Sequence, residues 1–582
     1  DQFNWGYDPL NYNVPEGSYS TDPYDGAVRV NEMKQMVQTL HNNNINVIMD
    51  VVYNHVYDAG TFCFNQAVPK YFSRTNADGS YSNGSGCGND TASERSMVHK
   101  YIVDSILYWH EEYHIDGFRF DLVGLLDTET INEIVDSVHA VDPDIIFYGE
   151  GWTMDTAVSK ENVTMATQAN ASATPNFAYF NDTFRDGIAG KDAQGNGLIW
   201  QVGNESTMSA CYLGRSWWCT NPTQTINYAS CHDNYTLMDK INAVSNAGVD
   251  SYEDVPGDYQ VKLNNLTAAY YMFAEGIPLI HAGEDFLRIK LDEDGTIIHN
   301  SYNASDYVNT LRWYNLDTEV YADTTEYYKG LIEFRKNHAA LRLSTATEVS
   351  NNVTYHWVTN NVLLYTFDGA SVADEVADGI ITIYNASSND CQINLYGKDG
   401  NGTSYGVAQG EWQVCVNGDN AGTEVLSTIT NGVVTVPAHT AMALVKGETV
   451  DTDSVYTRNN KVAISLDKTE IETGVNAVVA INATVNPANS TLIWESSDET
   501  VATVDAYGRV TTLADGNATI TVSTLHGVTA TCEVTVDSSI EVEEEVSINK
   551  TELSLVKGSS ETLVVTISPV GTTATFVSSD ES

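Results

Sequence analysis

Short apolar segments alternate with amphipathic segments along the first part of the chain. Apolar residues recur at every third or fourth position over residues 28–44 and 95–113, which predicts helices there. Further helices are predicted over 261–275 and 326–341. Apolar runs near positions 47, 117, 146, 178, 227 and 279 predict six strands. Strands that alternate with helices indicate a parallel sheet of the α/β class.

Four of these predicted strands end in residues that carry chemistry. The run at 46–52 is apolar enough for a strand buried on both faces of a sheet. The four segments end in Asn54 and His55, in Asp121, in Glu150 between two glycines, and in His232 and Asp233. Glycines beside a carboxylate allow a ligand to approach closely. In a parallel barrel such ends converge, so we expect one pocket.

Arg119 lies two residues before Asp121. Side chains alternate along a strand, so the two residues share a face. A neighbouring cation favours the ionised carboxylate, which suits a nucleophile. A purely structural ion pair explains the same two residues, and the pair alone does not decide between these interpretations.

The four segments resemble the four signature regions of glycoside hydrolase family 13, the α-amylase clan. Residues 3–9 also resemble the Tyr-Asn-Trp-Gly-Tyr-Asp-Pro motif of type I pullulanases, with Phe3 in place of the first tyrosine. Residues 180–186, 281–288 and 300–303 are similar to the same subfamily. So many motifs in the right order make a specific signal.

The resemblance implies a role for each site residue. Asp121 is expected to be the nucleophile, Glu150 the general acid and then base, and Asp233 the stabiliser of the transition state. The family's two reacting carboxyl groups lie about 5–5.5 Å apart, which gives retention of configuration. Residues expected to bind or position the sugar are Tyr7, His55, Arg119, Trp152, His232 and Asn234. Tyr7 would stack on a sugar ring, although an ordinary loop-packing tyrosine is the alternative.

The resemblance also implies a (β/α)8 barrel over residues 1–345, yet only six strands are found. In the family the first two strands precede the motif at residues 3–9. We therefore expect the chain to lack these strands, any N-terminal carbohydrate-binding modules, and any signal peptide. An open six-stranded sheet has two unpaired edges, so we expect poor stability and poor turnover from the chain as given.

The remainder of the chain is predicted to be β-structure. Residues 348–447 contain short strands without a helical pattern and indicate a β-sandwich, followed by a polar linker at 448–460. The sequence at 468–471 recurs 82 positions later at 550–553, and that at 496–499 recurs 82 positions later at 578–581. Both copies, at 461–537 and 546–582, resemble bacterial immunoglobulin-like domains of group 2. Four glutamates predict a solvated linker at 538–545.

Composition narrows the classes of partner. The formal net charge is −50, which argues against nucleic acid or an anionic membrane surface as a partner. No apolar run reaches the ~20 residues of a membrane-spanning helix. The 8 cysteines form no Cys-x-x-Cys pair. Candidate disulfides join Cys63 to Cys87, Cys211 to Cys219, and Cys391 to Cys415.

The resemblance therefore implies an extracellular enzyme that cleaves α-1,6 links in pullulan, starch and limit dextrins. An α-1,4-acting amylase of the same clan and a starch-binding surface protein without activity are the alternatives. The chemistry requires no cofactor, and the resemblance allows a structural calcium ion whose ligands the sequence does not identify. Immunoglobulin-like repeats are typical of spacers or cell-surface stalks, so attachment to a cell surface is a further expectation.

Overall fold

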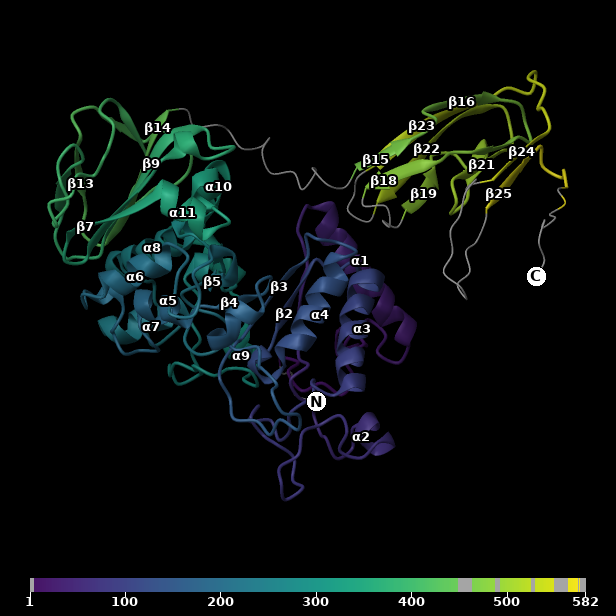
Figure 1. Ribbon diagram of the computed structural model, residues 1–582. Coiled ribbons are helices and arrows are strands. Elements are labelled where there is room, and N and C mark those ends of the chain that lie inside the picture. The colour runs from purple at the N-terminus through teal and green to yellow at the C-terminus, as the bar shows by residue number, and fades with distance from the viewer. Residues whose placement is uncertain are drawn as a thin grey trace.

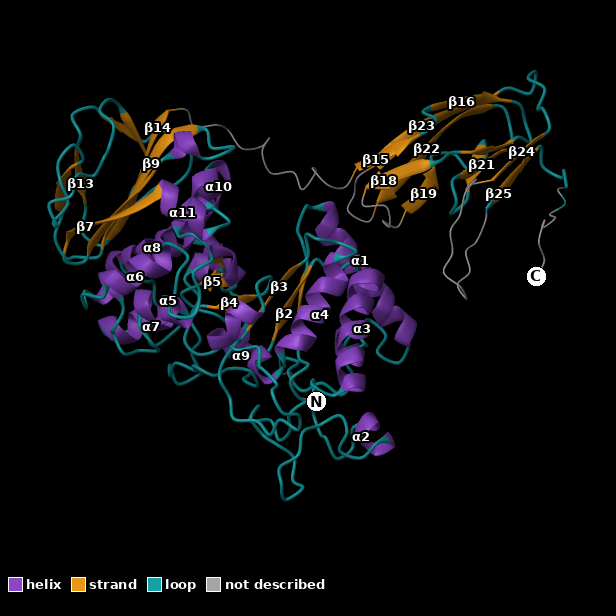
Figure 2. Cartoon of the chain, viewed as in Figure 1, coloured by secondary structure: helices purple, strands orange, loops and turns teal. Residues whose placement is uncertain are grey.

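The computed structural model describes residues 5–447, 463–486, 492–524, 529–548, 564–573 and 575. Its first part is an α/β unit whose strands are flanked by helices, and a β-sandwich follows directly (Figure 1). The described elements from residue 463 onward are all strands (Figure 2). The predicted linker at 448–460 and most of the predicted second repeat lie outside the described residues.

The α/β unit is built on a parallel sheet with the strands in sequence order, β1-β2-β3-β4-β5-β6. Its strands are β1 Ile48–Val51, β2 Gly117–Phe120, β3 Ile146–Gly149, β4 Ala178–Phe180, β5 Thr225–Asn227 and β6 Ile277–Pro278. All six match the predicted positions. In the described part of the chain β1 and β6 are the edges of this sheet. Ile48 is 38% exposed, so the prediction that the first strand is buried on both faces is wrong.

Helices precede, connect and follow these strands. They are α1 Gly26–Asn42, α2 Cys63–Ala67, α3 Ser96–Tyr113, α4 Thr128–His139, α5 Asp182–Ala189, α6 Glu205–Tyr212, α7 Leu237–Ser245, α8 Asp258–Phe273, α9 Asp306–Asn309 and α10 Glu319–Asn337. The last of these begins and ends earlier than the predicted helix at 326–341. Side chains at the helix starts satisfy free backbone N–H groups: Asp25 accepts from Ala27 and Asp127 from Thr130.

After the short helix α11 (Ala346–Asn352), which the sequence did not predict, an antiparallel sheet follows in the order β12-β11-β14-β9-β8-β7. A second pair of strands, β10-β13, faces it. The strands are β7 Val353–Thr359, β8 Val362–Phe367, β9 Ala377–Asn385, β10 Cys391–Asn394, β11 Trp412–Val416, β12 Ser427–Ile429, β13 Val433–Val436 and β14 Thr440–Gly447.

The α/β unit and the sandwich share one hydrophobic core. Tyr212 of α6 stacks on Tyr365 of β8 with ring centroids 3.7 Å apart. The Tyr212 hydroxyl also meets Thr382 and Tyr384 of β9, at 2.9 and 3.0 Å. Because these aromatic rings are fully buried between the two parts, the sandwich packs against α6 and stabilises it.

The immunoglobulin-like part has a four-stranded sheet, β16-β23-β22-β19, and a three-stranded sheet, β17-β21-β20. Its strands are β15 Ala463–Leu466, β16 Glu470–Thr473, β17 Val478–Ala480, β18 Ala483–Asn486, β19 Leu492–Ser496, β20 Ala502–Val504, β21 Arg509–Thr512, β22 Gly516–Thr524 and β23 Thr529–Val536.

The described start of the second repeat has the same pairing as the first. Residues 463 and 486 are partners in β15 and β18, and residues 545 and 568 are partners in β24 (Glu545–Ile548) and β25 (Val565–Ser568). Both partners are shifted by the 82 positions that the sequence repeat predicts. The acidic segment before β24 exposes its glutamates, but Ile540 is half-buried and its carbonyl approaches Gly474.

The three candidate disulfides are absent, because all eight cysteines are free. Cys211 lies buried in α6, and the Cys219 thiol donates instead to the carbonyl of Asn221 at 3.1 Å. Cys63 and Cys87 are exposed thiols. Spacing alone therefore gave the wrong expectation for these residues.

Candidate active site

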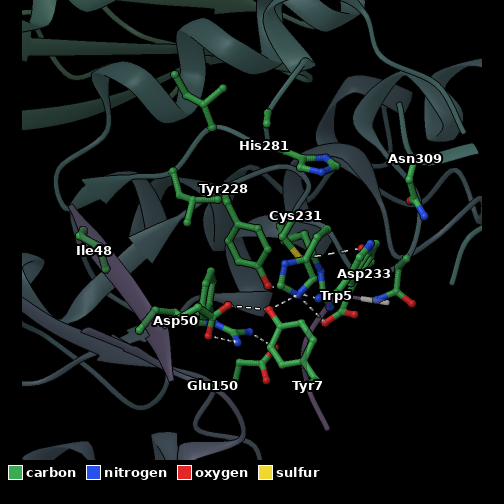
Figure 3. A pocket seen from close by; sticks show the side chains of 18 of the residues that line it. Trp5, Tyr7, Ile48, Asp50, Glu150, Tyr228, Cys231, Asp233, His281 and Asn309 are labelled. Atoms are coloured by element: carbon green, nitrogen blue, oxygen red, sulfur yellow. Dashed lines mark hydrogen bonds and ion pairs between the residues drawn. The ribbon is translucent and has the colours of Figure 1, made fainter. Parts of the chain in front are cut away.

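A cavity of about 780 Å³ opens at the carboxyl ends of the parallel strands. Seven of the predicted site residues line it: Tyr7, Arg119, Glu150, Trp152, His232, Asp233 and Asn234. Figure 3 shows the side chains of Tyr7, Asp50, Glu150 and Asp233 gathered in it. The predicted segment ends at Glu150 and at His232 and Asp233 thus meet in one pocket with Arg119, whereas Asp121, Asn54 and His55 do not line it.

Arg119 is the centre of the charge network. Its guanidinium contacts Asp50 Oδ1 at 2.8 Å, Asp121 Oδ1 at 3.2 Å and Glu150 Oε1 at 2.9 Å. Burial works to lower the pKa of Arg119, but the three carboxylates hold it above its usual value. A permanent positive charge therefore lies among three acidic groups.

Asp121 directly follows β2 and lies beside the cavity rather than among the residues that line it. Its Oδ2 accepts a hydrogen bond from Asn54 Nδ2 at 2.7 Å. Burial raises the pKa of Asp121, while Arg119 and Asn54 work to lower it. The predicted pair with Arg119 is present, but burial outweighs it in setting the pKa.

Glu150 directly follows β3 and is buried. Its Oε2 accepts from the backbone N–H of Leu122 at 3.1 Å, and its Oε1 pairs with Arg119. Burial raises the pKa of Glu150 to about 7, with Asp121 and Asp233 adding to the rise and Arg119 opposing it. A carboxyl group in this state holds a proton near neutral pH, which a general acid requires.

The glycines around Glu150 serve packing within the protein. A Cβ on Gly149 would lie 2.5 Å from the carbonyl oxygen of Phe120, and one on Gly151 would lie 2.4 Å from the ring of Tyr179. These close approaches, rather than the room for a ligand that the sequence suggested, account for both glycines.

Asp233 lies in a loop and not at the end of a strand, because β5 ends at Asn227. The prediction that this strand ends in His232 and Asp233 is therefore wrong, although Asp233 still reaches the cavity. Burial works to raise the pKa of Asp233, but His232, whose Nε2 lies 3.6 Å from Oδ2, and Arg119 hold it below its usual value. His232 itself packs against Trp5, with ring centroids 4.8 Å apart.

Tyr7 is held by a residue that the sequence analysis did not single out. Its hydroxyl donates to Asp50 Oδ2 at 2.5 Å and lies 3.4 Å from His232 Nε2. Burial raises the pKa of Tyr7, so the hydroxyl remains protonated. The available signal for Asp50 was a single carboxylate within the otherwise apolar run at 46–52.

His55 is buried beside the site but does not line the cavity. Its Nδ1 lies 2.5 Å from Asn54 Oδ1, and its Nε2 has no hydrogen-bond partner among the described residues. Burial lowers the pKa of His55, which favours the neutral ring. His55 thus supports Asn54, which in turn holds Asp121.

Other lining residues were also missed by the sequence analysis. They include Trp5, Tyr148, Asp182, Arg185, Tyr228, His281, Arg288 and Asn309. Several belong to segments quoted above for their family resemblance, but no pattern in the sequence separated them from their neighbours. In the described ranges no group of three or more His, Cys, Asp or Glu side chains is placed to hold a metal ion. Nor does any described helix have the length and apolar character to cross a membrane.

Residues 460–534 match the bacterial Ig-like domain (group 2) family. The pullulanase of Bacillus subtilis (strain 168) is 37% identical over 404 residues, which are 68% of this chain and 54% of that protein. Pullulanase 1, chloroplastic, of Arabidopsis thaliana is 33% identical over 375 residues, covering 53% of this chain and 37% of that protein. The chain thus spans about half the length of the first of these relatives.

Solved structures of pullulanases are similar to this chain as well. The pullulanase from Paenibacillus barengoltzii in complex with maltohexaose and alpha-cyclodextrin has a TM-score of 0.68 at 36% identity, covering 77% of this chain and 66% of that chain. Type I pullulanase from Bacillus subtilis str. 168, complexed with maltose, has a TM-score of 0.68 at 32% identity, covering 77% and 60%.

Proposed function

Because the chain is similar to pullulanases in sequence and structure, we propose that it is a retaining glycoside hydrolase that cleaves α-1,6-glucosidic links in pullulan, starch and limit dextrins. The observation that carries the proposal is that two carboxyl groups, the half-buried Asp121 and the buried Glu150, both pair with the guanidinium of Arg119. They follow adjacent strands, and burial brings the pKa of Glu150 to about 7. One carboxyl group is therefore suited to give a proton while the other attacks.

In the first step, Asp121 attacks the anomeric carbon and the bond from that carbon to the glucosidic oxygen breaks. Glu150 gives its proton to the departing oxygen, and a covalent glycosyl-enzyme forms. In the second step, Glu150 takes a proton from water, whose oxygen attacks the same carbon and releases Asp121. Two inversions restore the configuration, so the product sugar is the α anomer.

Neighbouring residues position the sugar. Tyr7, fixed by Asp50, offers its aromatic face to the ring at the cleaved bond. Asp233, ionised by its low pKa, binds sugar hydroxyls and favours the positive charge that develops on the ring. His232 hydrogen-bonds the sugar at the cleaved bond. Trp152 and Asn234 also line the cavity, where they contact the branch region of the substrate.

We further infer that β1–β6 are six strands of a (β/α)8 barrel. Six parallel strands in sequence order, with catalytic groups at their carboxyl ends, suit that architecture. The sheet is open between β1 and β6, where Ile48 and Leu279 line the cavity. Two further strands between these edges would close it.

The setting of the enzyme is also a proposal. The net charge of −50 and the immunoglobulin-like repeat suit an extracellular protein held at or near a cell surface. Hydrolysis by two carboxyl groups needs no cofactor. A structural calcium ion remains a family expectation only, since the described residues offer no acidic cluster for it.

The test is product analysis on pullulan and on amylose, for this chain and for a form extended upstream of residue 1, with Asp121→Asn as the control. Maltotriose from pullulan, absent with the variant, is the expected result. Cleavage of amylose but not of pullulan would favour the α-1,4-acting alternative. Binding of both polymers without cleavage by either form would favour a starch-binding protein.

A further inference from the structure

Lys290 is a fully buried lysine in the segment that follows β6. Its Nζ donates to three backbone carbonyls: His232 at 3.2 Å, Asn234 at 2.6 Å and His299 at 3.2 Å. An ammonium group has three N–H donors, so these contacts satisfy all of them. The two carbonyls at 232 and 234 flank Asp233.

The same lysine is fixed through its backbone. Its N–H donates to Asp239 Oδ1 at 3.1 Å, and Asp239 Oδ2 accepts from the N–H of Thr236 at 3.1 Å. Asp239 and Thr236 form the capping box that begins α7. Lys290 therefore holds the loop between β5 and α7 at two places. Its side chain binds the carbonyls on either side of Asp233, and its backbone N–H binds Asp239 at the start of α7.

The loop needs such support because it lies outside the sheet. From Tyr228 to Asn234 no residue belongs to a helix or strand, and Asn234 has a φ of 61°. Asparagine adopts this left-handed region more readily than most residues, and contacts from outside the loop fix it in that conformation. The hydrogen bond from Lys290 to the Asn234 carbonyl is a direct restraint of that kind.

We propose that Lys290 is a positioning residue for Asp233: it binds the carbonyls of the two neighbouring residues, His232 and Asn234, and thereby aims the Asp233 carboxylate into the cavity. The proposal rests on the proposed function for its catalytic consequence but not for its structural one. The positive charge also contributes to the low pKa of Asp233. Lys290 itself does not line the cavity.

Lys240 provides a matched control. It is also a buried lysine, it donates to one carbonyl, Ala229 at 3.0 Å, and it lies in α7. Burial lowers the pKa of both lysines to about 8. Removing either ammonium leaves buried carbonyls unpaired, but only Lys290 holds the residues around Asp233.

The experiment compares Lys290→Met, Lys290→Arg and Lys240→Met in the full chain. The first readout is amide hydrogen exchange, measured by mass spectrometry on peptides that cover residues 228–236. We expect Lys290→Met to speed exchange at residues 232–236 at least tenfold and Lys290→Arg to restore much of the protection. Lys240→Met, whose partner is the Ala229 carbonyl, is expected to act on α7 and on the start of the loop and to leave residues 232–236 protected. Equal exchange in Lys290→Met and the wild type would overturn the proposal.

The second readout is steady-state kinetics on pullulan. A displaced catalytic group costs on the order of 10²-fold, so we expect kcat of Lys290→Met to fall by about that factor with KM little changed. Lys240→Met is expected to lose far less kcat at the same loss of thermal stability. Equal losses of kcat in the two variants would mean that Lys290 acts only on stability. If neither this chain nor the form extended upstream of residue 1 cleaves pullulan or amylose, the proposed function fails, and the exchange measurement alone decides the role of Lys290.

Discussion

Arg119 Nη2 and Glu150 Oε1 lie 2.9 Å apart, so the proposed acid shares its cation with the proposed nucleophile. A fixed positive charge beside Glu150 works against its protonation, yet burial raises the pKa of this group to about 7. The site thus combines a carboxyl group that keeps its proton with a network that limits how high the pKa rises. The balance between burial and the charge of Arg119 determines the expected effects of replacing Glu150 and of changing the pH.

Replacing Glu150 by Gln removes the proton donor and leaves the shape of the side chain. General acid catalysis is worth about 10²–10⁴-fold, so kcat/KM on pullulan is expected to fall by that factor. A maltosyl fluoride substrate needs little protonation of its leaving group, and its first step is expected to be nearly unaffected in a pre-steady-state assay. Asp121→Asn, by comparison, should lose both reactions. Equal losses on both substrates for Glu150→Gln would contradict the assignment.

The pH dependence of kcat/KM follows from the same group. Glu150 acts as an acid only while protonated, and a pKa of about 7 means that the protonated fraction falls tenfold per pH unit above neutrality. The alkaline limb of the profile is therefore expected near pH 7. The residual activity of Glu150→Gln should show no such limb. A limb that persists unchanged in this variant would assign it to another group.

Tyr7 and Asp50 are expected to act as one unit. Tyr7→Phe removes the hydrogen bond to Asp50, and Asp50→Asn removes its charge and one contact of Arg119. Residues in direct contact couple by about 0.5–3 kcal/mol, so the double variant should lose less kcat/KM than the product of the single losses. A double-mutant cycle on pullulan measures this coupling. Strict additivity would show that the two residues act separately.

Local sequence patterns were sufficient to predict the six strands and the ion pair between Arg119 and Asp121. The alternation of Arg119 and Asp121 along β2 placed both side chains in one network, and apolar runs located each strand of the sheet. Asp50 was not identified because its partners, Tyr7 and Arg119, are distant in sequence. Periodicity within one segment contains no information on such a contact.

The loop that carries Asp233 shows the same limit. The predicted strand near position 227 was expected to end in His232 and Asp233, yet the chain leaves the sheet after Asn227. Buried partners outside the segment hold it there: Lys290 binds the carbonyls of His232 and Asn234, and Glu284 accepts from the Ser230 hydroxyl at 2.7 Å. Tertiary contacts therefore override local propensity, which sequence reasoning on a single segment does not detect.

The tyrosine interface between α6 and the sandwich is expected to make the first two parts unfold together. Truncating a large buried aromatic side chain costs about 3–5 kcal/mol, so Tyr212→Ala should lower the unfolding temperature strongly. Tyr212→Phe keeps the stacking on Tyr365 and loses hydroxyl contacts, which are worth about 1 kcal/mol each. Scanning calorimetry measures both effects. Tyr24→Ala, at a side chain that is 99% exposed, is the control and should change nothing.

The immunoglobulin-like part is expected to be dispensable for the chemistry. Every residue that lines the cavity lies between positions 5 and 310, and the sandwich that braces the helices ends with β14 at Gly447. A chain that stops after residue 447 should therefore retain kcat/KM on soluble pullulan within about twofold, a factor worth only ~0.4 kcal/mol. On insoluble starch or intact cells the same truncation is expected to reduce retention of the enzyme, which a sedimentation assay measures. A large loss of activity on soluble pullulan would mean that the repeat contributes to the site, and would refute its role as a spacer.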